Sequence, residues 1–264
     1  MELQDAVAIV TGGARGFGRA FADKILAARG KVLITDVDVQ ELRATGEALQ
    51  AQYGEKNVCW RFQDVTEKDS FSQAFAYASE YFHEPVNVLV NNAGVFSAMS
   101  FYEHESTYWE TIVDIDLIAP IRGTRCAIAE FKRTLNGKEG VVVNVASMAG
   151  LVHVPFAPDY AAAKHGVVGL TRSLYTLQKS DNIRCFCMCP GFADTDMGRN
   201  AEETVPEYTS IMGGLLPVQV IVDAFVAGLR EPDNAGRVQC IMHDGIMYHS
   251  FPTDKVLSPT PDCE

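Results

Sequence analysis

Short apolar runs alternate with longer helical patterns along most of this 264-residue chain, and this alternation limits the possible folds more than any other feature. The runs are too short for helices, which is typical of strands buried in a parallel sheet. A helical segment between two runs can carry the chain back to the start of the next strand. The pattern therefore predicts a parallel sheet covered by helices on both faces.

The sequence predicts seven strands and six principal helices, which makes the fold class α/β with a doubly wound parallel sheet. The strands are expected at Ala6–Thr11, Lys31–Asp36, Val58–Gln63, Asn87–Asn91, Gly140–Ala146, Ile183–Cys189 and Arg237–Met242. The helices are expected to begin near Gly16, Val39, Glu67, Ser106, Ala157 and Pro217. Thr66 with Asp69 is typical of an N-cap followed by its acidic third position, and Gly30 is expected to end the first helix.

Composition indicates one large domain. The chain is 47% hydrophobic and 21% charged, which suits a sizeable core, and it contains no repeat or interdomain linker. We predict a single domain over residues 1–251. Within it, residues 196–216 are long for a connection and are expected to form a mobile lid. Residues 252–264, rich in Pro, Asp and Ser, are expected to form a C-terminal tail.

Charge and cysteine content exclude several classes of function. The net charge is −12 and no basic stretch interrupts it, which argues against a nucleic-acid partner. The acidic start does not resemble a signal peptide, and no apolar run reaches membrane-spanning length, so no stable membrane insertion is expected. Cys185, Cys187 and Cys189 should face one side of a strand, where their spacing favours core thiols over a metal site. We expect no metal and a reduced, cytoplasmic protein.

A glycine-rich segment, Thr11-Gly12-Gly13-Ala14-Arg15-Gly16-Phe17-Gly18, joins the first predicted strand to the first helix. Glycines at positions 12, 16 and 18 allow a tight turn and a close approach of the backbone to a pyrophosphate at the positive end of the helix. Asp36 ends the second strand, where a carboxylate can accept hydrogen bonds from an adenosine ribose and repel a 2′-phosphate. NAD is therefore expected rather than NADP. Arg15 could instead bind a 2′-phosphate, or it could be a solvated surface side chain.

Other distinctive residues follow further strands. Asp64-Val65 ends the third strand, Asn91-Asn92-Ala93-Gly94 the fourth, Ser147 the fifth and Pro190-Gly191 the sixth. Because the carboxyl ends of parallel strands meet at one edge of a sheet, we expect a single site there.

Tyr160 and Lys164 stand four residues apart in a predicted helix and should share one of its faces. An ammonium held beside a phenol favours the ionised form and lowers the pKa of the phenol. A phenol tuned in this way can exchange a proton with an alcohol. Such pairs also occur by chance, so this pair alone does not settle a function.

Taken together, these motifs resemble the short-chain dehydrogenase/reductase family in identity and order over about residues 5 to 245. The resemblance implies a Rossmann-like, NAD(P)-binding catalytic domain that moves a hydride between a nicotinamide and a CH–OH carbon. It implies that Tyr160 is the acid/base, that Lys164 lowers the pKa of Tyr160 and binds the nicotinamide ribose, and that Ser147 binds the substrate oxygen. The implied cofactor-binding residues are Gly12, Arg15, Gly16, Phe17, Gly18, Asp36, Asp64, Val65, Asn91, Ala93, Gly94, Tyr160, Lys164, Pro190, Gly191 and Thr195.

Within the family, the segments around Ser147, Tyr160 and Pro190 most resemble the NAD-dependent 15-hydroxyprostaglandin dehydrogenases. Two positions depart from the pattern. The family usually has Asn where this chain has Asp116, so an ionised Asp116 could raise the pKa of Tyr160, or it could be a tolerated near-isostere. The prostaglandin dehydrogenases have Gln where this chain has Ala157, and this puts prostaglandin itself in question.

Three loops beyond the predicted nicotinamide position are apolar, which suits a lipid-like secondary alcohol and a role in lipid metabolism. The residues in question are Phe96, Met99, Phe101, Leu151, Val152, Val154, Phe156, Phe192, Met197, Tyr208, Ile211, Met212, Leu215 and Leu216. Half of them could simply pack the lid onto the domain. The expected substrate contacts are Ser147, Phe96, Ala157 and Phe192.

The sequence therefore predicts an NAD-dependent oxidoreductase for an alcohol such as a 15-hydroxyprostaglandin or a hydroxy fatty acid. One alternative is an NADPH-dependent carbonyl reductase that uses Arg15. Another is a catalytically silent, dinucleotide-binding regulatory protein. The resemblance also implies a homodimer or homotetramer formed through about 106–135 and 157–179.

Overall fold

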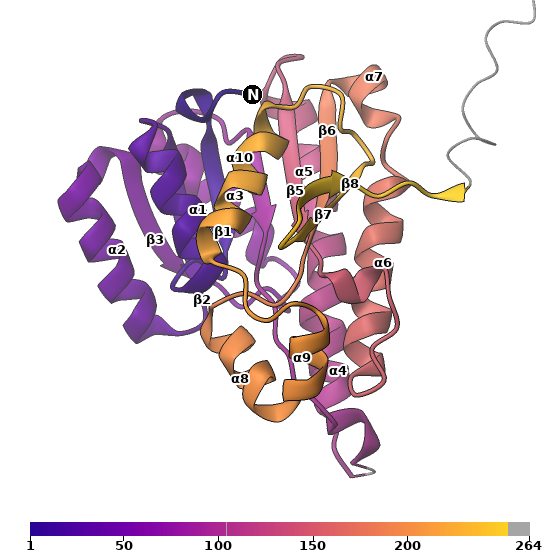
Figure 1. Ribbon diagram of the computed structural model, residues 1–264. Helices are drawn as coiled ribbons and strands as arrows, with labels where there is room; N and C mark the ends of the chain where they lie inside the picture. Colours follow the sequence, from indigo (N-terminus) through magenta and orange to yellow (C-terminus); the bar gives the residue numbers. More distant parts are fainter. Residues whose placement is uncertain (104, 253–264) are drawn as a thin grey trace, which may run out of the picture.

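The computed structural model describes residues 1–103 and 105–252, and these form one α/β layered domain (Figure 1). Eight strands make a single sheet in the order β3-β2-β1-β4-β5-β6-β7-β8. Their bounds are β1 Val7–Thr11, β2 Lys31–Asp36, β3 Val58–Phe62, β4 Val88–Asn91, β5 Gly140–Val145, β6 Ile183–Pro190, β7 Val238–Met242 and β8 Gly245–Tyr248. The first seven strands are parallel, and β8 pairs antiparallel to β7. The predicted fold class is confirmed.

The seven predicted strands are present with small shifts at their ends, whereas β8 was not predicted. Strands β1, β4, β5 and β6 are buried along their whole length, which explains why they are continuous apolar runs in the sequence. β8 follows β7 after only two residues and lies at the sheet edge, where none of its residues is buried. Its apolar run, Ile246-Met247-Tyr248, is only three residues long and lies close behind β7, so the sequence did not separate it as a strand.

Helices cover both faces of the sheet. One face carries α1 Gly16–Ala27, α2 Val39–Tyr53 and α10 Val218–Arg230, and the other carries α3 Ser70–Phe82, α5 Ala119–Thr134 and α6 Pro158–Arg172. The shorter helices are α4 Tyr108–Val113, α7 Leu177–Asp181, α8 Asp196–Thr204 and α9 Pro206–Ile211. The 3-10 segments are η1 Leu3–Asp5, η2 Glu55–Asn57, η3 Ser100–Tyr102 and η5 Met148–Gly150, and η4 Asp114–Ile118 is π-helical. The predicted lid becomes α8 and α9, below the carboxyl edge of the sheet in Figure 1.

Two predicted helix boundaries were wrong. α3 begins at Ser70 rather than near Glu67, because Thr66 does not cap it: its hydroxyl donates to Asp64 Oδ1 at 2.7 Å and closes a turn after β3. α1 ends at Ala27, and Arg29 rather than Gly30 takes the left-handed conformation, with φ of 74°. Gly30 is required for space, since a Cβ there would lie 2.5 Å from the carbonyl oxygen of Leu3.

The three alternating cysteines of β6 are buried and face one side, as predicted. Cys185, Cys187 and Cys189 pack into the α5 and α6 face, while Phe186 and Met188 pack into the opposite core cluster. Burial raises the pKa of the Cys185 thiol to about 12, which suits a core side chain rather than a nucleophile. Across residues 1–103 and 105–252, no three His, Cys, Asp or Glu side chains are grouped to hold a metal. The described residues also contain no helix with the length and apolar character needed to span a bilayer.

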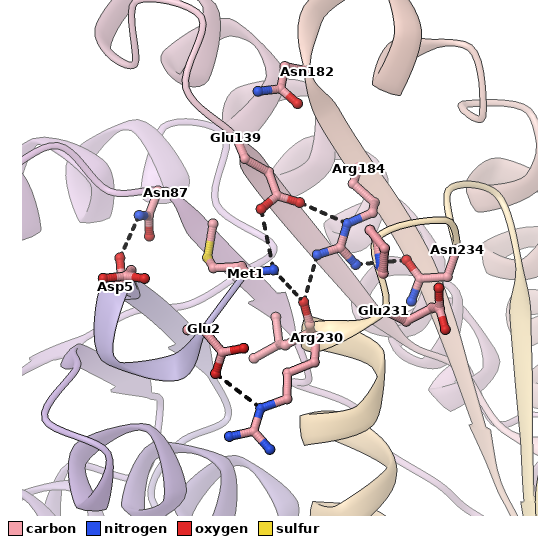
Figure 2. A network of polar contacts seen from close by, with 12 residues as sticks. Met1, Glu2, Asp5, Asn87, Glu139, Asn182, Arg184, Arg230, Glu231 and Asn234 are labelled. Atoms are coloured by element: carbon pink, nitrogen blue, oxygen red, sulfur yellow. Dashed lines mark hydrogen bonds and ion pairs between the residues drawn. The ribbon is translucent and has the colours of Figure 1, made fainter.

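A buried cation joins the sheet to α10 at the amino edge (Figure 2). Arg184 of β6 is fully buried, and its Nε lies 3.0 Å from Glu139 Oε1. Its other nitrogens donate to Gly228 O at 2.8 Å, Leu229 O at 2.8 Å and Asn234 Oδ1 at 2.7 Å. Because every partner is a strong acceptor, this charge is well satisfied inside the protein.

Candidate active site

A cavity of about 580 Å³ opens at the carboxyl edge of the sheet. Its walls come from the loops after β1 to β6 and from α8 and α9. Most of the predicted site residues line it: Gly12, Arg15, Gly16, Phe17, Asp36, Asp64, Val65, Ala93, Gly94, Phe96, Asp116, Ser147, Tyr160, Lys164, Pro190, Gly191, Phe192 and Thr195. Gly18, Asn91 and Ala157 were predicted for the site but do not line this cavity.

The glycine-rich loop forms a cradle in which glycine is required by backbone conformation at two positions and by space at a third. Gly12 and Gly16 have φ of 63° and 55°, in the region that favours glycine. A Cβ on Gly18 would lie 2.2 Å from the carbonyl oxygen of Gly12, so Gly18 permits the turn although it does not face the cavity. Asn92 Nδ2 holds the loop by donating to Thr11 O at 2.9 Å and Gly12 O at 3.1 Å. Backbone nitrogens at the start of α1 are thereby open to a ligand, which fits a pyrophosphate.

Asp36 lines the end of the cavity beside β2, and Asp38 lies just outside the lining. Asp36 accepts hydrogen bonds from the backbone nitrogens of Ala14 and Asp38, each at 3.1 Å, which fixes its carboxylate at the cavity wall. Arg15 Nη2 lies 2.9 Å from Asp38 Oδ2 in an exposed ion pair. The guanidinium of Arg15 is thus already engaged by a carboxylate, in a place where a 2′-phosphate would meet two negative side chains.

The Asn91 side chain is part of the core and not of the cavity wall. It is buried and donates to Asn144 Oδ1 at 2.8 Å and Thr124 Oγ1 at 3.2 Å, joining β4 to β5 and α5. The neighbouring Asn92 lines the cavity instead, although the sequence analysis did not assign it a contact. Their shared motif located the segment but could not show which amide faces inward.

Ser147, Tyr160 and Lys164 lie together on the cavity wall. Ser147 is the N-cap of η5, and its hydroxyl accepts from Ala149 N at 3.1 Å. Tyr160 and Lys164 are one turn apart on α6, and Lys164 Nζ lies 5.4 Å from the centroid of the Tyr160 ring. The Ser147 side chain is near enough to Tyr160 to lower the pKa of the phenol. This places a phenol between a hydroxyl and an ammonium at one point of the cavity.

Asp116 reaches Lys164 directly. Its Oδ1 lies 2.8 Å from Lys164 Nζ, its Oδ2 accepts from Val95 N at 3.2 Å, and the side chain is fully buried. It sits in the π-helical segment η4 between α4 and α5. Pro120 explains that segment, because proline has no N–H to donate to the Asp116 carbonyl four residues earlier.

Burial and neighbouring charges oppose each other in this group. Burial raises the pKa of Tyr160, the Lys164 ammonium lowers it, and Asp116 raises it again, so that the net pKa lies above the ordinary value. Burial alone would lower the pKa of Lys164, but Asp116 and Tyr160 outweigh it and raise the pKa above its usual range. Burial raises the pKa of Asp116, against the attraction of Lys164. Lys164 is therefore held as a cation, and part of its effect on Tyr160 is cancelled by Asp116.

The outer part of the cavity is apolar. Of the residues predicted there, Phe96, Val152, Val154, Phe156, Phe192, Met197, Tyr208 and Met212 line it, whereas Met99, Phe101, Leu151, Ile211, Leu215 and Leu216 do not. Ala157 is fully buried behind the wall, packed among Phe96, Phe156 and Tyr160. Met148 and Tyr108 line the cavity and were missed. The position of Met148 directly after Ser147 was the signal that could have identified it.

The lid residues are ordered against the cavity. Thr195 caps α8, its Oγ1 accepting from Gly198 N at 3.1 Å. On α9, the Tyr208 hydroxyl donates to His153 O at 3.0 Å, which ties the helix to the loop after β5. The mobility expected of residues 196–216 stays a prediction.

The chain is similar to known proteins in both sequence and structure. Residues 6–206 match the family model described as short chain dehydrogenase. The chain is 29% identical over 267 residues to a 15-hydroxyprostaglandin dehydrogenase [NAD(+)] of Bos taurus, covering 96% of this chain and 97% of the relative. It is 32% identical over 197 residues to 3beta-hydroxysteroid dehydrogenase 2 of Eggerthella lenta, with 74% of each chain covered. A crystal structure of a short-chain dehydrogenase/reductase from Burkholderia phymatum in complex with NAD superposes with a TM-score of 0.77 at 26% identity, covering 88% of each chain.

Proposed function

Because the chain belongs to the short-chain dehydrogenase/reductase family, we propose that it is an NAD-dependent oxidoreductase that interconverts a secondary alcohol and a ketone. The observation that carries the proposal is the placement of Ser147, Tyr160 and Lys164 on one cavity wall beside a glycine cradle. The direction proposed for the reaction is oxidation of the alcohol.

Each side chain has a role that its position supports. The substrate hydroxyl lies between Ser147 and Tyr160, and the Tyr160 phenolate removes its proton. Lys164 favours the phenolate through its charge. Asp116 holds Lys164 in place at 2.8 Å. When bound, NAD supplies the hydride acceptor.

The residues around the cradle fit NAD better than NADP. Gly12, Gly16 and the start of α1 would hold the pyrophosphate, and Asp36 would accept hydrogen bonds from the adenosine ribose. Asp64, Val65, Ala93, Gly94, Pro190, Gly191 and Thr195 would complete the cofactor site. The ion pair between Arg15 and Asp38 weighs against the NADPH-dependent carbonyl reductase, because it engages the cation that this alternative needs.

The apolar outer cavity supports a lipid-like alcohol, such as a 15-hydroxyprostaglandin or a hydroxy fatty acid. Phe96 and Phe192 lie on this wall and would contact the substrate. Ala157 is buried and has no polar side-chain group, whereas the prostaglandin dehydrogenases carry Gln at this position. A cytoplasmic location and a homodimer or homotetramer remain part of the proposal, with sedimentation of the purified protein as the test of assembly.

The test is turnover by purified protein with NAD or NADP and a panel of hydroxy lipids, hydroxysteroids and simple secondary alcohols. Formation of the reduced cofactor with NAD, lost by more than about a hundredfold in Tyr160→Phe, is the expected result. NAD binding, measured by calorimetry, should survive the substitution. Equal turnover by Tyr160→Phe would refute the assigned role. NAD binding without turnover of any panel member would favour the catalytically silent alternative.

A further inference from the structure

Five aromatic rings form a continuous wall on the outer side of the cavity. The Phe96 ring lies 5.3 Å from Tyr160 and 6.3 Å from Phe156, measured between centroids. Tyr208 then contacts Phe156 at 4.8 Å and Phe192 at 6.2 Å. This aromatic wall joins the proposed acid/base to α9 and to the loop after β6. It offers a substrate a large apolar surface and few polar contacts.

On the part of the cavity wall that the structure describes, each cation is already paired with a carboxylate of the protein. Among the described lining residues, only Arg15 and Lys164 carry a positive charge. Lys164 is held by Asp116 beside the proposed reaction centre. Arg15 lies at the opposite, β2 end, paired with Asp38. A carboxylate entering the outer part of the cavity would therefore lose its hydration without gaining an ionic partner.

The mouth of the cavity is acidic as well. We call its mouth the two segments that each supply several lining residues, 95–110 without residue 104 and 194–212, which both lie below the sheet in Figure 1. The described residues of these segments carry eight exposed carboxylates, of which Asp196 lines the cavity and the others lie outside the lining: Glu103, Glu105, Glu110, Asp194, Asp196, Glu202, Glu203 and Glu207. Their described residues include one cation of the Lys or Arg type, Arg199, which is paired with both Asp194 and Asp196. A cleft bordered by charges of one sign lowers the local concentration of ligands of the same sign.

We propose that the site selects uncharged secondary alcohols and discriminates against lipids that carry a carboxylate. The inference rests on the proposed function and, within the proposed class of lipid-like secondary alcohols, replaces the hydroxy acids given as examples by their neutral counterparts, such as esters and amides. At short range, the aromatic wall disfavours a substrate carboxylate because its rings supply no cation to pair with it. The acidic mouth repels it at longer range, within the screening length of about 8 Å at physiological salt.

The experiment compares two probes that differ in this charge and by one methyl group, 9-hydroxydecanoic acid and its methyl ester. Purified protein is assayed with NAD at pH 8, and kcat/KM is measured for each probe. The ester should exceed the acid by about tenfold or more, and the ratio should fall when the salt is raised from about 20 mM to about 300 mM, because salt screens the mouth. An acid turned over as well as the ester would overturn the inference while upholding the proposed function. If neither probe nor any other alcohol were turned over, the proposed function itself would fail.

Three variants locate the source of the discrimination. Met212→Lys places a long cation on the cavity wall and should shift the ester-to-acid ratio toward the acid, a gain that misfolding cannot produce. Asp196→Asn removes one carboxylate from the mouth and one partner of Arg199, and should lower the ratio by about threefold. Its matched control is Glu47→Gln, which breaks the exposed Arg43–Glu47 pair on α2 and changes the net charge equally. An unchanged ratio in both Met212→Lys and Asp196→Asn would contradict the proposal.

Discussion

Two buried cations lie at opposite edges of the same sheet, and they are satisfied in different ways. Arg184, at the amino edge, is fully buried and bound by Glu139, two backbone carbonyls and Asn234. Lys164, at the carboxyl edge, lies 2.8 Å from Asp116 and 3.3 Å from the Val145 carbonyl, and it faces a cavity. The first charge has its partners within the protein. The Lys164 ammonium also faces the cavity, where a ligand can reach it.

The comparison teaches how a buried charge can be assigned to stability or to function. A cation whose donors are all engaged by the protein holds elements together, and its removal leaves several acceptors unpaired. A cation that faces a cavity and shares it with a phenol changes the proton affinity of its neighbours. Four substitutions can break or sharpen this distinction.

The largest effect on stability is expected for Arg184→Leu. Loss of the guanidinium leaves Asn234 Oδ1 without its donor and removes one contact each from Glu139, Gly228 O and Leu229 O, which keep contacts to the Met1 amino group or to Asn234 Nδ2. The free energy of unfolding should fall by about 3–5 kcal/mol, measured by urea denaturation. Arg43→Leu, which breaks an exposed pair on α2, is the control and should leave stability unchanged. A loss no greater than in that control would show that the network contributes little.

Lys164→Met should mainly affect activity. We expect kcat/KM to fall by about a hundredfold or more. The stability loss should be smaller than for Arg184→Leu, since burial already raises the pKa of Asp116 and allows it to become neutral. Near neutral pH, Asp116 is then protonated in the folded variant but ionised in the unfolded chain. Because the folded state binds the additional proton, the free energy of unfolding should increase as pH falls from 8 toward 5. Denaturation midpoints across that range provide the measurement, and a midpoint independent of pH would exclude a neutralised Asp116.

Asp116→Asn should shift the pH dependence of turnover. Removing this negative charge relieves a contribution that raises the pKa of Tyr160, so the rise of kcat/KM should move to lower pH. The other groups that act on Tyr160 are Lys164, Ser147 and the Cys189 thiol of β6, all retained in the variant. A profile that overlays the parent would support the near-isostere reading of Asp116.

Asp159→Asn is the matched control for that experiment. Asp159 is buried on α6 and acts on Asp116 by charge, but it does not line the cavity. The expected shift is therefore smaller than for Asp116→Asn. A shift in Asp159→Asn of the same size would indicate a general field effect instead of the contact between Asp116 and Lys164.

Glu139→Gln is expected to have the smallest effect, about 1 kcal/mol of stability. Gly228, Leu229 and Asn234 still accept from Arg184, and the amide oxygen can replace one carboxylate contact. Activity should be unchanged, because Glu139 lies at the edge opposite the cavity. A loss of activity without a loss of stability would contradict the assignment of the amino-edge charge to stability and of the carboxyl-edge charge to function.

Much of the fold could be predicted because its signals are local. Buried parallel strands have to be apolar along their length, so β1 and β6 could be recognised without knowing their neighbours. The glycine loop is constrained in a similar way, since a Cβ at Gly12 or Gly18 would meet backbone atoms. β8 was missed because an exposed edge strand carries no such requirement, and Thr66 misled because its hydroxyl could close a turn as well as cap a helix.

The sequence by itself determined the parallel α/β sheet, the edge that carries the site and most of the residues gathered there, because buried strands have to be apolar and the glycine turn follows from local sterics. Only the tertiary structure decided that Asn91 supports the core, that Ala157 lies behind the wall and that Asp116 contacts Lys164. It also decided that the aromatic wall and the acidic mouth enclose one cavity. Those relations join residues tens of positions apart, and packing between distant segments fixes them.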